Sequence, residues 1–332
     1  MTSVAAVSGL FEAISAGGGN PDQILRLLGF DRTVLSNREG FISSSVFTLL
    51  LEEAARSTGD DCFGLHFGER YNPMDIGPLA YAILNAPTIA SACETAGRYM
   101  KVVNEAVRMS HTVVGDRVYI RHLLVDVELK VPRQHNEFGT AVLLNMFRMM
   151  FGKQWVPRQV QFAHKAPAQT SEHLRVFEAP IVFDRTANAL VIERECFEGR
   201  VPTADPRLYP ILRRYLEEVL SATPREDSLL ASVRRNIAES MTDGDPKLSR
   251  VARRIATSPR TLQRKLKEHG VDFKKLMDDT RRRFAISYLQ DHKNTLTQVA
   301  FLLGYSELSA FNRAFKRWTG ATPLDYRRKI AR

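Results

Sequence analysis

The sequence predicts two parts of different fold class: an α+β N-terminal part, with helices on a small, largely antiparallel sheet, and an all-α C-terminal part. Apolar residues follow both helical and strand-like periods up to about residue 200, and only helical periods after it. Near the C-terminus a degenerate internal repeat indicates two helix-turn-helix units joined by a long helix. The length of 332 residues fits two domains of ordinary size.

Helical patterns dominate the start of the N-terminal part. Val46, Leu49, Leu50 and Ala54, for example, lie on one stripe of an expected helix. The glycine run 17–19 follows no predicted strand and precedes no Lys-Ser/Thr pair, so it does not predict a phosphate-binding loop. Helices are expected over residues 4–16, 21–28, 43–57, 88–102 and 134–151.

Strand-like patterns follow the fourth of these helices. Residues 107–114 and 117–125 are rich in β-branched side chains, and Gly115 and Asp116 between them predict a hairpin turn. Further short strands are expected over residues 159–162, 181–183 and 190–192.

Prolines mark the boundary between the two parts. Pro202, Pro206, Pro210 and Pro224 surround or enter one amphipathic segment, residues 208–220. We therefore expect an N-terminal domain over residues 1–205, a helical linker over 206–227 and a C-terminal domain over 228–332, with the boundary near residue 225.

The internal repeat defines the C-terminal part. Val251-Ala252, five residues and Ser258 recur as Val299-Ala300, five residues and Ser306. The small alanines fit a close approach of two helices, and the serines are expected to cap the second helix of each unit. Each second helix stops at a glycine, Gly270 or Gly320. A helix over residues 273–290, roughly 27 Å long, is expected to join the units.

The side chains that face outward in each second helix suit DNA. Leu262 and Leu266, and likewise Phe311 and Phe315, are expected to face the core at a spacing of four residues, so the residues between them face solvent. Arginine pairs with guanine, and asparagine or glutamine with adenine, in the major groove. Candidates for base contacts are Arg260, Thr261, Gln263, Arg264, Ser309, Asn312 and Arg313. Candidates for phosphate contacts are Lys265, Lys267, Lys316 and Arg317.

The charge distribution points the same way. The chain carries 47 basic and 37 acidic residues, a net charge of +10. Residues 229–332 hold 23 basic and 10 acidic residues, a net of +13, whereas residues 1–228 have a net of −3. Such asymmetry is typical of a polyanion-binding domain attached to a near-neutral one.

The C-terminal part resembles the AraC/XylS family of bacterial transcription regulators over about residues 229–332. The run from Val299 to Pro323, which ends in Gly320-Ala321-Thr322-Pro323, follows the signature of the family's second unit. The first unit fits through Ala252, Ser258, Leu262, Arg264 and Gly270, and departs in having Leu266 where phenylalanine is common.

The N-terminal part resembles the AraC-type arabinose-binding/dimerisation domain of regulators of the ornithine-utilisation type, over about residues 20–205. The similar residues run from Gly64 to Arg70 and from Asp75 to Thr88. The resemblance implies a domain that senses a small molecule or a partner, without implying that arabinose is the ligand. The sequence does not indicate which residues would bind an effector.

The resemblance implies a ligand-responsive, sequence-specific transcription regulator, most often an activator in this family. Its expected partners are double-stranded promoter DNA, RNA polymerase and a small-molecule effector, and a homodimer is compatible with it. No cofactor is expected. The alternative is a constitutive or architectural DNA binder whose N-terminal domain only dimerises. Either protein is expected in the bacterial cytoplasm, on the nucleoid when bound to DNA.

An enzyme is not expected. A DNA-alkyl repair protein would need a four-cysteine zinc site, and Cys62, Cys93 and Cys196 are three and scattered. No metal site is expected from the histidines either, since they are spread over different elements: His66, His111, His122 and His135. No segment approaches the ~20 apolar residues of a membrane span, and residues 1–19 lack the basic start of a secretory signal.

Two clusters have two interpretations each. Met146, Phe147, Met149, Met150 and Phe151 are more typical of a helix core than of an apolar pocket. Arg281, Arg282 and Arg283 would either contact phosphate or lie in solvent on the long helix.

Overall fold

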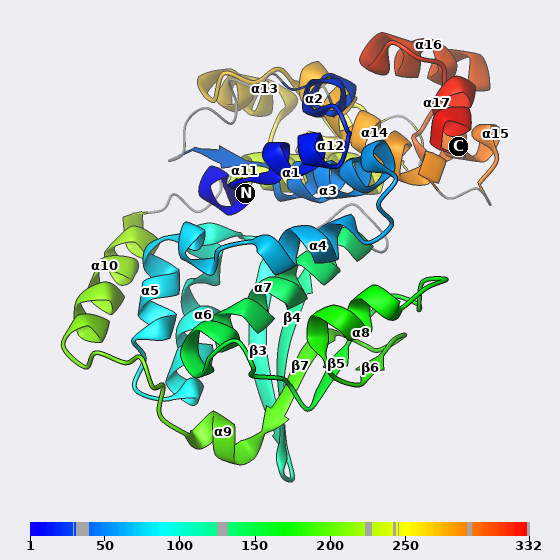
Figure 1. Cartoon of the computed structure of the whole chain (residues 1–332). Coiled ribbons are helices and arrows are strands. Elements are labelled where there is room, and N and C mark those ends of the chain that lie inside the picture. The colour runs from blue at the N-terminus through cyan, green and yellow to red at the C-terminus, as the bar shows by residue number, and fades with distance from the viewer. Residues whose placement is uncertain are drawn as a thin grey trace. The chain divides into compact units, whose positions relative to one another are not determined.

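The computed structural model describes residues 1–28, 30, 40–124, 132–222, 228–241, 244, 246–290 and 294–330. It divides into two compact units, one formed by Met1–Ile24 with Arg32–Thr223 and the other by Leu25–Asp31 with Pro224–Arg332 (Figure 1). The first is α+β and the second is helical, as the sequence predicts.

The first unit contains a five-stranded sheet in the order β3-β4-β7-β5-β6. Its strands are β3 (Val107–Val114), β4 (Arg117–Leu124), β5 (Gln159–Gln161), β6 (Ile181–Val182) and β7 (Asn188–Glu193). The β3–β4 hairpin turns at Gly115 and pairs Val114 with Arg117. All neighbours are antiparallel except β5 and β6, so the predicted sheet is confirmed. The expected strand end at Val125 lies outside the described residues.

Helices pack on this sheet and on one another. They are α1 (Leu10–Ala16), α3 (Ser44–Thr58), α4 (Phe63–Arg70), α5 (Pro78–Leu84), α6 (Ile89–Val103), α7 (Arg133–Phe151), α8 (Ser171–Phe177), α9 (Arg194–Glu198) and α10 (Leu208–Ala222), with 3-10 turns at Val4–Val7 and Pro73–Ile76. The division between the two units falls within α2 (Pro21–Leu28). A two-stranded ladder joins β1 (Thr2–Ser3) to β2 (Phe41–Ile42). Helix α6 packs against β3, and α7 packs against β4 and β7 (Figure 1).

Two glycines of the first unit allow a close contact between α4 and α7. A Cβ atom at Gly64 would lie 2.1 Å from the carbonyl oxygen of Gln134, and one at Gly68 would lie 2.7 Å from that of Phe138. The Gly64 amide also donates to Oε1 of Gln134 at 2.7 Å. Any larger residue at position 64 or 68 would therefore force the helices apart.

The helix expected over residues 4–16 is not continuous. The chain forms a 3-10 turn at Val4–Val7 and then begins α1 at Leu10, with Gly9 at its N-cap. Gly9 has a φ of 77°, in the left-handed region, which a continuing right-handed helix does not accept.

The segment expected to form a linker, residues 206–227, contains α10. This helix packs against α5 and α6 and is part of the first compact unit. Residues 223–227, including the expected boundary near residue 225, lie outside the described residues.

The second unit is all helical. Its helices are α11 (Ser228–Met241), α12 (Leu248–Arg254), α13 (Pro259–Glu268), α14 (Phe273–Gln290), α15 (Leu296–Leu302), α16 (Leu308–Thr319) and α17 (Pro323–Ile330). Helix α14 has the bounds that the sequence predicts and contacts α11, α15, α16 and α17. No helix in the described part of the chain has the length and hydrophobicity needed to cross a membrane.

Candidate nucleic-acid interface and internal pocket

Helices α12 and α13 form the first helix-turn-helix unit. Ala252 is fully buried between them, as are Leu262 and, to 1% exposure, Leu266. Ser258 caps α13, since its Oγ accepts from the Thr261 amide at 3.1 Å, and Pro259 occupies the first turn. The expected roles of the small residue, the core leucines and the serine cap are confirmed.

Helices α15 and α16 form the second helix-turn-helix unit, and one prediction about it, the serine cap of α16, is wrong. Thr295 is the N-cap of α15 and forms a capping box with Gln298, and Phe311 and Phe315 are fully buried in α16. Ser306, however, does not cap α16. The N-cap is Glu307, which makes no side-chain cap hydrogen bond and whose Oε2 instead accepts from Ser309 Oγ at 3.1 Å.

The length of the turn explains this correction. Residues 255–258 separate α12 from α13, whereas residues 303–307 separate α15 from α16, so the second turn is one residue longer. Ala256 and Gly304 occupy equivalent places in the two turns, with φ values of 53° and 75°. Glycine accepts this left-handed conformation without cost, whereas alanine at position 256 is strained.

The expected DNA-contacting residues form one exposed stripe on each second helix. Arg260, Gln263, Arg264 and Lys267 are exposed at positions i, i+3, i+4 and i+7 of α13. The corresponding positions of α16 are Ser309, Asn312, Arg313 and Lys316, of which all but the half-buried Asn312 are exposed. Residues at this spacing share a helix face. The two helices therefore present matching polar stripes, and Lys265 and Arg317 are exposed beside them.

Several of these side chains have partners within the unit. Arg264 pairs with Glu268 one turn later, and Arg317 Nη2 lies 3.3 Å from Asp278 Oδ2. Thr261 is half-buried, and its hydroxyl lies 2.8 Å from the capping Ser258 hydroxyl. Exposed pairs of this kind are weak and exchange readily for other anions.

Asn312 is the exception among the candidates. Its Oδ1 atom is buried and has no hydrogen-bond partner among the described residues.

The basic run on the long helix is not at the surface. Arg281, Arg282 and Arg283 are 5%, 9% and 7% exposed, which contradicts both expected interpretations. Arg281 Nε donates to the Leu303 carbonyl at 3.0 Å, and its guanidinium lies 4.6 Å from the centre of the Tyr305 ring. Arg281 therefore holds the turn between α15 and α16 against α14.

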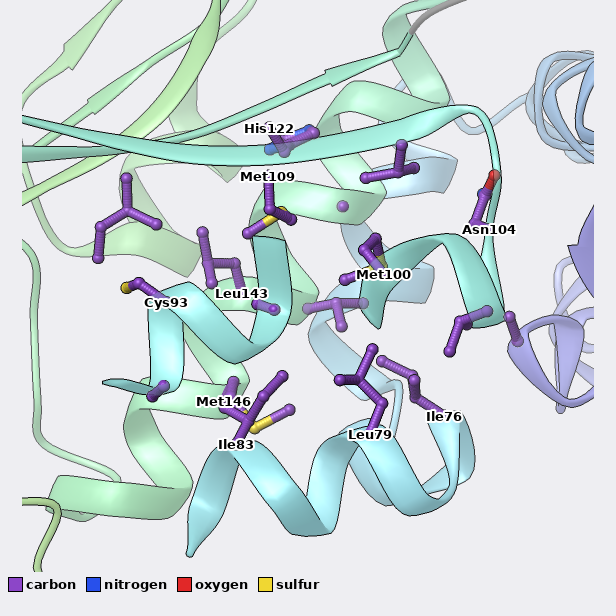
Figure 2. A pocket seen from close by; sticks show the side chains of 18 of the residues that line it. Ile76, Leu79, Ile83, Cys93, Met100, Asn104, Met109, His122, Leu143 and Met146 are labelled. Atoms are coloured by element: carbon purple, nitrogen blue, oxygen red, sulfur yellow. The ribbon is translucent and has the colours of Figure 1, made fainter. Parts of the chain in front are cut away.

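The first unit contains an apolar cavity of about 130 Å³ that is partly open to solvent. It lies between the sheet strands β3 and β4 and the helices α5, α6 and α7 (Figure 2). Met146, Phe147 and Met150 belong to the buried hydrophobic core and also line this pocket, so both interpretations of the Met/Phe cluster hold for them, whereas Met149 is 39% exposed.

The structure brings together two of the histidines that the sequence left apart. His122 of β4 and His135 of α7 both line the cavity and are buried. Burial lowers the pKa of His122 to about 4 and that of His135 to about 3, so both rings are neutral at pH 7. His135 Nδ1 lies 2.7 Å from Thr48 Oγ1, whereas neither ring nitrogen of His122 has a hydrogen-bond partner among the described residues.

The remaining histidines named above have structural contacts. His66 bridges Asp60 and Glu172 at 2.7 and 3.0 Å, and the His111 ring lies 4.9 Å from that of Phe197. In the ranges that the structure describes, no group of three or more His, Cys, Asp or Glu side chains could hold a metal ion.

The three cysteines are free thiols. Cys93 lines the cavity, and burial raises its pKa to about 12; burial likewise raises the pKa of Cys62 to about 11. Both are therefore protonated, unreactive thiols at pH 7.

Comparisons with known proteins cover both units. Residues 18–201 match the family described as the arabinose-binding domain of AraC transcription regulator, N-terminal, and residues 251–329 match a helix-turn-helix domain family. The ornithine utilization regulator of Pseudomonas aeruginosa is 29% identical over 295 residues, 89% of this chain and 86% of that protein. The HTH-type transcriptional regulator VirS of Mycobacterium tuberculosis is 28% identical over 312 residues, 93% of this chain and 91% of that protein. The crystal structure of the transcriptional regulator CdpR from Pseudomonas aeruginosa aligns with 92% of this chain and 98% of its own, at 21% identity and a TM-score of 0.45.

Proposed function

The chain belongs to the AraC family of transcription regulators, and from this premise we propose that it is a ligand-responsive activator of transcription. Its C-terminal unit is a DNA-binding helix-turn-helix domain, and its relatives are transcription regulators rather than enzymes. In the proposal, the protein acts in the bacterial cytoplasm at promoters, where it contacts RNA polymerase, alone or as a homodimer.

The DNA-binding mode that we propose places α13 and α16 in two successive major-groove faces. The observation that carries it is the pair of matching stripes, because four equivalent positions on two separate helices are polar and all but one are exposed. Helix α14 joins the two helix-turn-helix units over 18 residues, roughly 27 Å, which is close to the ~34 Å of one DNA turn. Base edges are assigned to Arg260, Thr261, Gln263, Arg264, Ser309, Asn312 and Arg313, and phosphates to Lys265, Lys267, Lys316 and Arg317.

The cavity supports the ligand-responsive part of the proposal. Its wall includes Cys93 and Met100 on one face of α6 (Figure 2). Another face of α6 holds α10, since Tyr99 donates to Glu217 at 2.8 Å and Thr95 lies 2.8 Å from the Tyr209 hydroxyl. A ligand that shifts α6 would therefore change the packing of α10, the helix that precedes the DNA-binding unit in the chain.

A ligand can bias such an arrangement only through a difference in its affinity for the two states. The alternative, a constitutive or architectural DNA binder with a purely dimerising first unit, gives no reason for an apolar cavity in that unit.

The test of the DNA-binding mode is genome-wide binding of the full-length protein at physiological salt, with footprinting of the strongest sites. We expect a few discrete promoter sites, each protected on two adjacent major-groove faces. Arg313→Ala should weaken binding to such a site by about 1–3 kcal/mol and relax the preference at one base position. Lys316→Ala is the matched control, because losing a phosphate contact weakens specific and random duplexes alike.

Two results would contradict the proposal. Diffuse, salt-sensitive binding without discrete sites would favour the architectural alternative. An equal loss on specific and random duplexes for Arg313→Ala would make that residue a phosphate contact.

A further inference from the structure

We propose that an exposed face of α10 in the first unit pairs with the same helix of a second copy of this chain, in antiparallel orientation. The inference rests on the proposed function, because it names the partner of a regulator that this function allows to act alone or as a homodimer. It also assigns the surface through which the two copies meet.

Helix α10 carries an apolar stripe that stays exposed although the helix is packed in the first unit. Leu208, Ile211 and Tyr215 are 36%, 64% and 50% exposed. They lie at positions i, i+3 and i+7, and residues at this spacing share one face of a helix. Leu216 is 1% exposed and belongs to the core of the first unit, so a different face of α10 anchors the helix there. The stripe is therefore additional to the face that holds α10 in its own unit.

The spacing of the stripe suits another helix. Single exposed apolar residues are ordinary on a protein surface, whereas a contiguous exposed patch marks an interaction site. Apolar residues that alternate at spacings of three and four form the seam between two helices of a coiled coil. Ala222 continues the stripe seven residues after Tyr215 and is also exposed. Figure 1 shows α10 at the edge of the first unit, beside α5, where a second helix can approach it.

Three charged residues lie along one edge of this stripe. Arg207 belongs to the first turn of α10, since the Tyr209 amide already donates to the Asp205 carbonyl at 3.2 Å. Arg214 and Glu218 follow at one and about two helical turns further along, and all three charged side chains are exposed. At 3.6 residues per turn, the three directions differ by only about 40°. The edge is therefore basic in the N-terminal half of the helix and acidic near its C-terminal end.

An antiparallel pair centres the stripe on a two-fold axis near Arg213. Residues equally far from this position on either side then lie opposite each other, so Ile211 faces the partner's Tyr215. Leu208 reaches the level of the partner's Glu218. A two-fold interface repeats each of these contacts, because the same patch serves both copies.

The charges along the edge fit the antiparallel orientation and oppose the parallel one. In the antiparallel pair, Arg207 lies within one residue of the level of the partner's Glu218, and the two-fold makes this ion pair twice. In a parallel pair, Arg207 and Arg214 would each lie beside the same residue of the other copy. Charges that flank the seam decide the orientation of paired helices. The helix is thus complementary to itself only when the two copies run in opposite directions.

The size of the contact predicts a dimer of modest affinity. Helix α10 has 15 residues, so it is roughly 22 Å long and about 10 Å wide. One pair of such helices covers less than the ~800 Å² per partner of a standard interface. We therefore expect a dissociation constant of about 1–100 µM.

The test is analytical ultracentrifugation of the full-length protein over a concentration range around this dissociation constant. Wild type should form a dimer. Ile211→Asp should weaken dimerisation by at least about tenfold, because it places an unpaired carboxylate in the seam of each copy. Leu174→Asp is the matched control, since Leu174 is 53% exposed on α8 of the same unit, and this change should leave the dissociation constant as in wild type.

Charge reversal tests the orientation of the helices. Arg207→Glu and Glu218→Arg should each weaken the dimer by about three- to tenfold, because each turns two ion pairs into like-charge contacts. The double variant should recover the wild-type dissociation constant within about twofold, since it restores both pairs with the charges exchanged.

Three results would overturn the inference. These are a protein that stays monomeric throughout the concentration range, a dimer that Ile211→Asp leaves intact, and a charge-reversal series without loss in the single variants or without recovery in the double variant. If Ile211→Asp does not fold, the charge-reversal series decides the question alone.

Footprinting of wild type and Ile211→Asp separates this inference from the proposed function. Discrete DNA sites for a protein that is monomeric in the centrifuge would overturn the inference and leave the DNA-binding function in place. A dimer through α10 without any discrete DNA site would support the inference and overturn the proposed function.

Discussion

Replacing Gly304 with alanine should destabilise the second unit by about 2–4 kcal/mol. The φ of 75° lies in the left-handed region, which costs an L-residue about 1–2 kcal/mol. The new Cβ would lie 2.5 Å from the carbonyl oxygen of Gly244, so the backbone must shift, and such overpacking costs about 1–3 kcal/mol. Alanine recovers only about 0.4–1 kcal/mol by restricting the unfolded chain.

The first helix-turn-helix unit, α12 and α13, offers a matched control at the equivalent turn. Ala256 already has a φ of 53°, so Ala256→Gly relieves strain of about 1–2 kcal/mol and loses about 0.4–1 kcal/mol through the freer unfolded chain. We therefore expect Ala256→Gly to be neutral or to stabilise by up to about 1 kcal/mol. Glycine should thus be at least as stable as alanine in both turns, so that Gly304→Ala lowers the free energy of unfolding whereas Ala256→Gly does not.

The measurement is urea unfolding followed by tryptophan fluorescence. The chain has two tryptophans, Trp155 and Trp318, and a Trp155→Phe background leaves Trp318 on α16 as the reporter of the second unit. The midpoint and slope give the free energy of unfolding by linear extrapolation. A change smaller than about 0.5 kcal/mol for Gly304→Ala, typical of an ordinary surface site, or a clear loss for Ala256→Gly, would refute the left-handed turns.

Two other predictions concern buried groups. Arg281→Met should cost the second unit about 1.5–3 kcal/mol, because a buried carbonyl loses a charged donor, whereas the exposed Lys274→Met should change the same unfolding curve by less than about 0.5 kcal/mol. Because the folded pKa values of His122 and His135 lie below the unfolded value of 6.5, the unfolded state binds more protons, and the stability of the first unit should fall as the pH drops from about 6.5 to about 4. Each histidine contributes up to ~1.4 kcal/mol per pH unit to this slope, and Glu52, whose pKa burial raises to about 7, opposes it. His135→Phe should lower the slope in urea titrations followed by the fluorescence of Trp155 in a Trp318→Phe background; an unchanged slope would mean that His135 is not buried.

The fold was predictable wherever the contacts are local. The helix over residues 273–290 has its predicted bounds, and the hairpin turns at Gly115 as expected, since periodicity and turn residues determine both. The break at Gly9 was missed because glycine is tolerated inside short helical patterns, and only its positive φ ends the helix. Arg281 was assigned to the surface because a triple arginine run on a helix is normally solvated, and its burial depends on Leu303 and Tyr305, distant in sequence.

The pocket could not be predicted for the same reason. Apolar periodicity identifies the buried face of each helix, but whether facing side chains fill the space between them depends on how the elements pack. His122 and His135 meet at the cavity only because β4 and α7 pack together. A histidine on the inward face of a strand was the one available signal, and it is more often a satisfied core residue.

The internal repeat shows what fixes the outward stripes. Val251 corresponds to Val299 at an offset of 48 residues, whereas Leu262 corresponds to Phe311 at an offset of 49. The longer second turn absorbs this difference, and it also moves the N-cap from a serine to Glu307. The exposed positions nevertheless match, because each stripe keeps its spacing to the buried pair of its own helix rather than to the turn. The buried residues at positions 262 and 266, and at 311 and 315, therefore orient the exposed polar stripes, and a change in either turn affects stability before it affects which residues form those stripes.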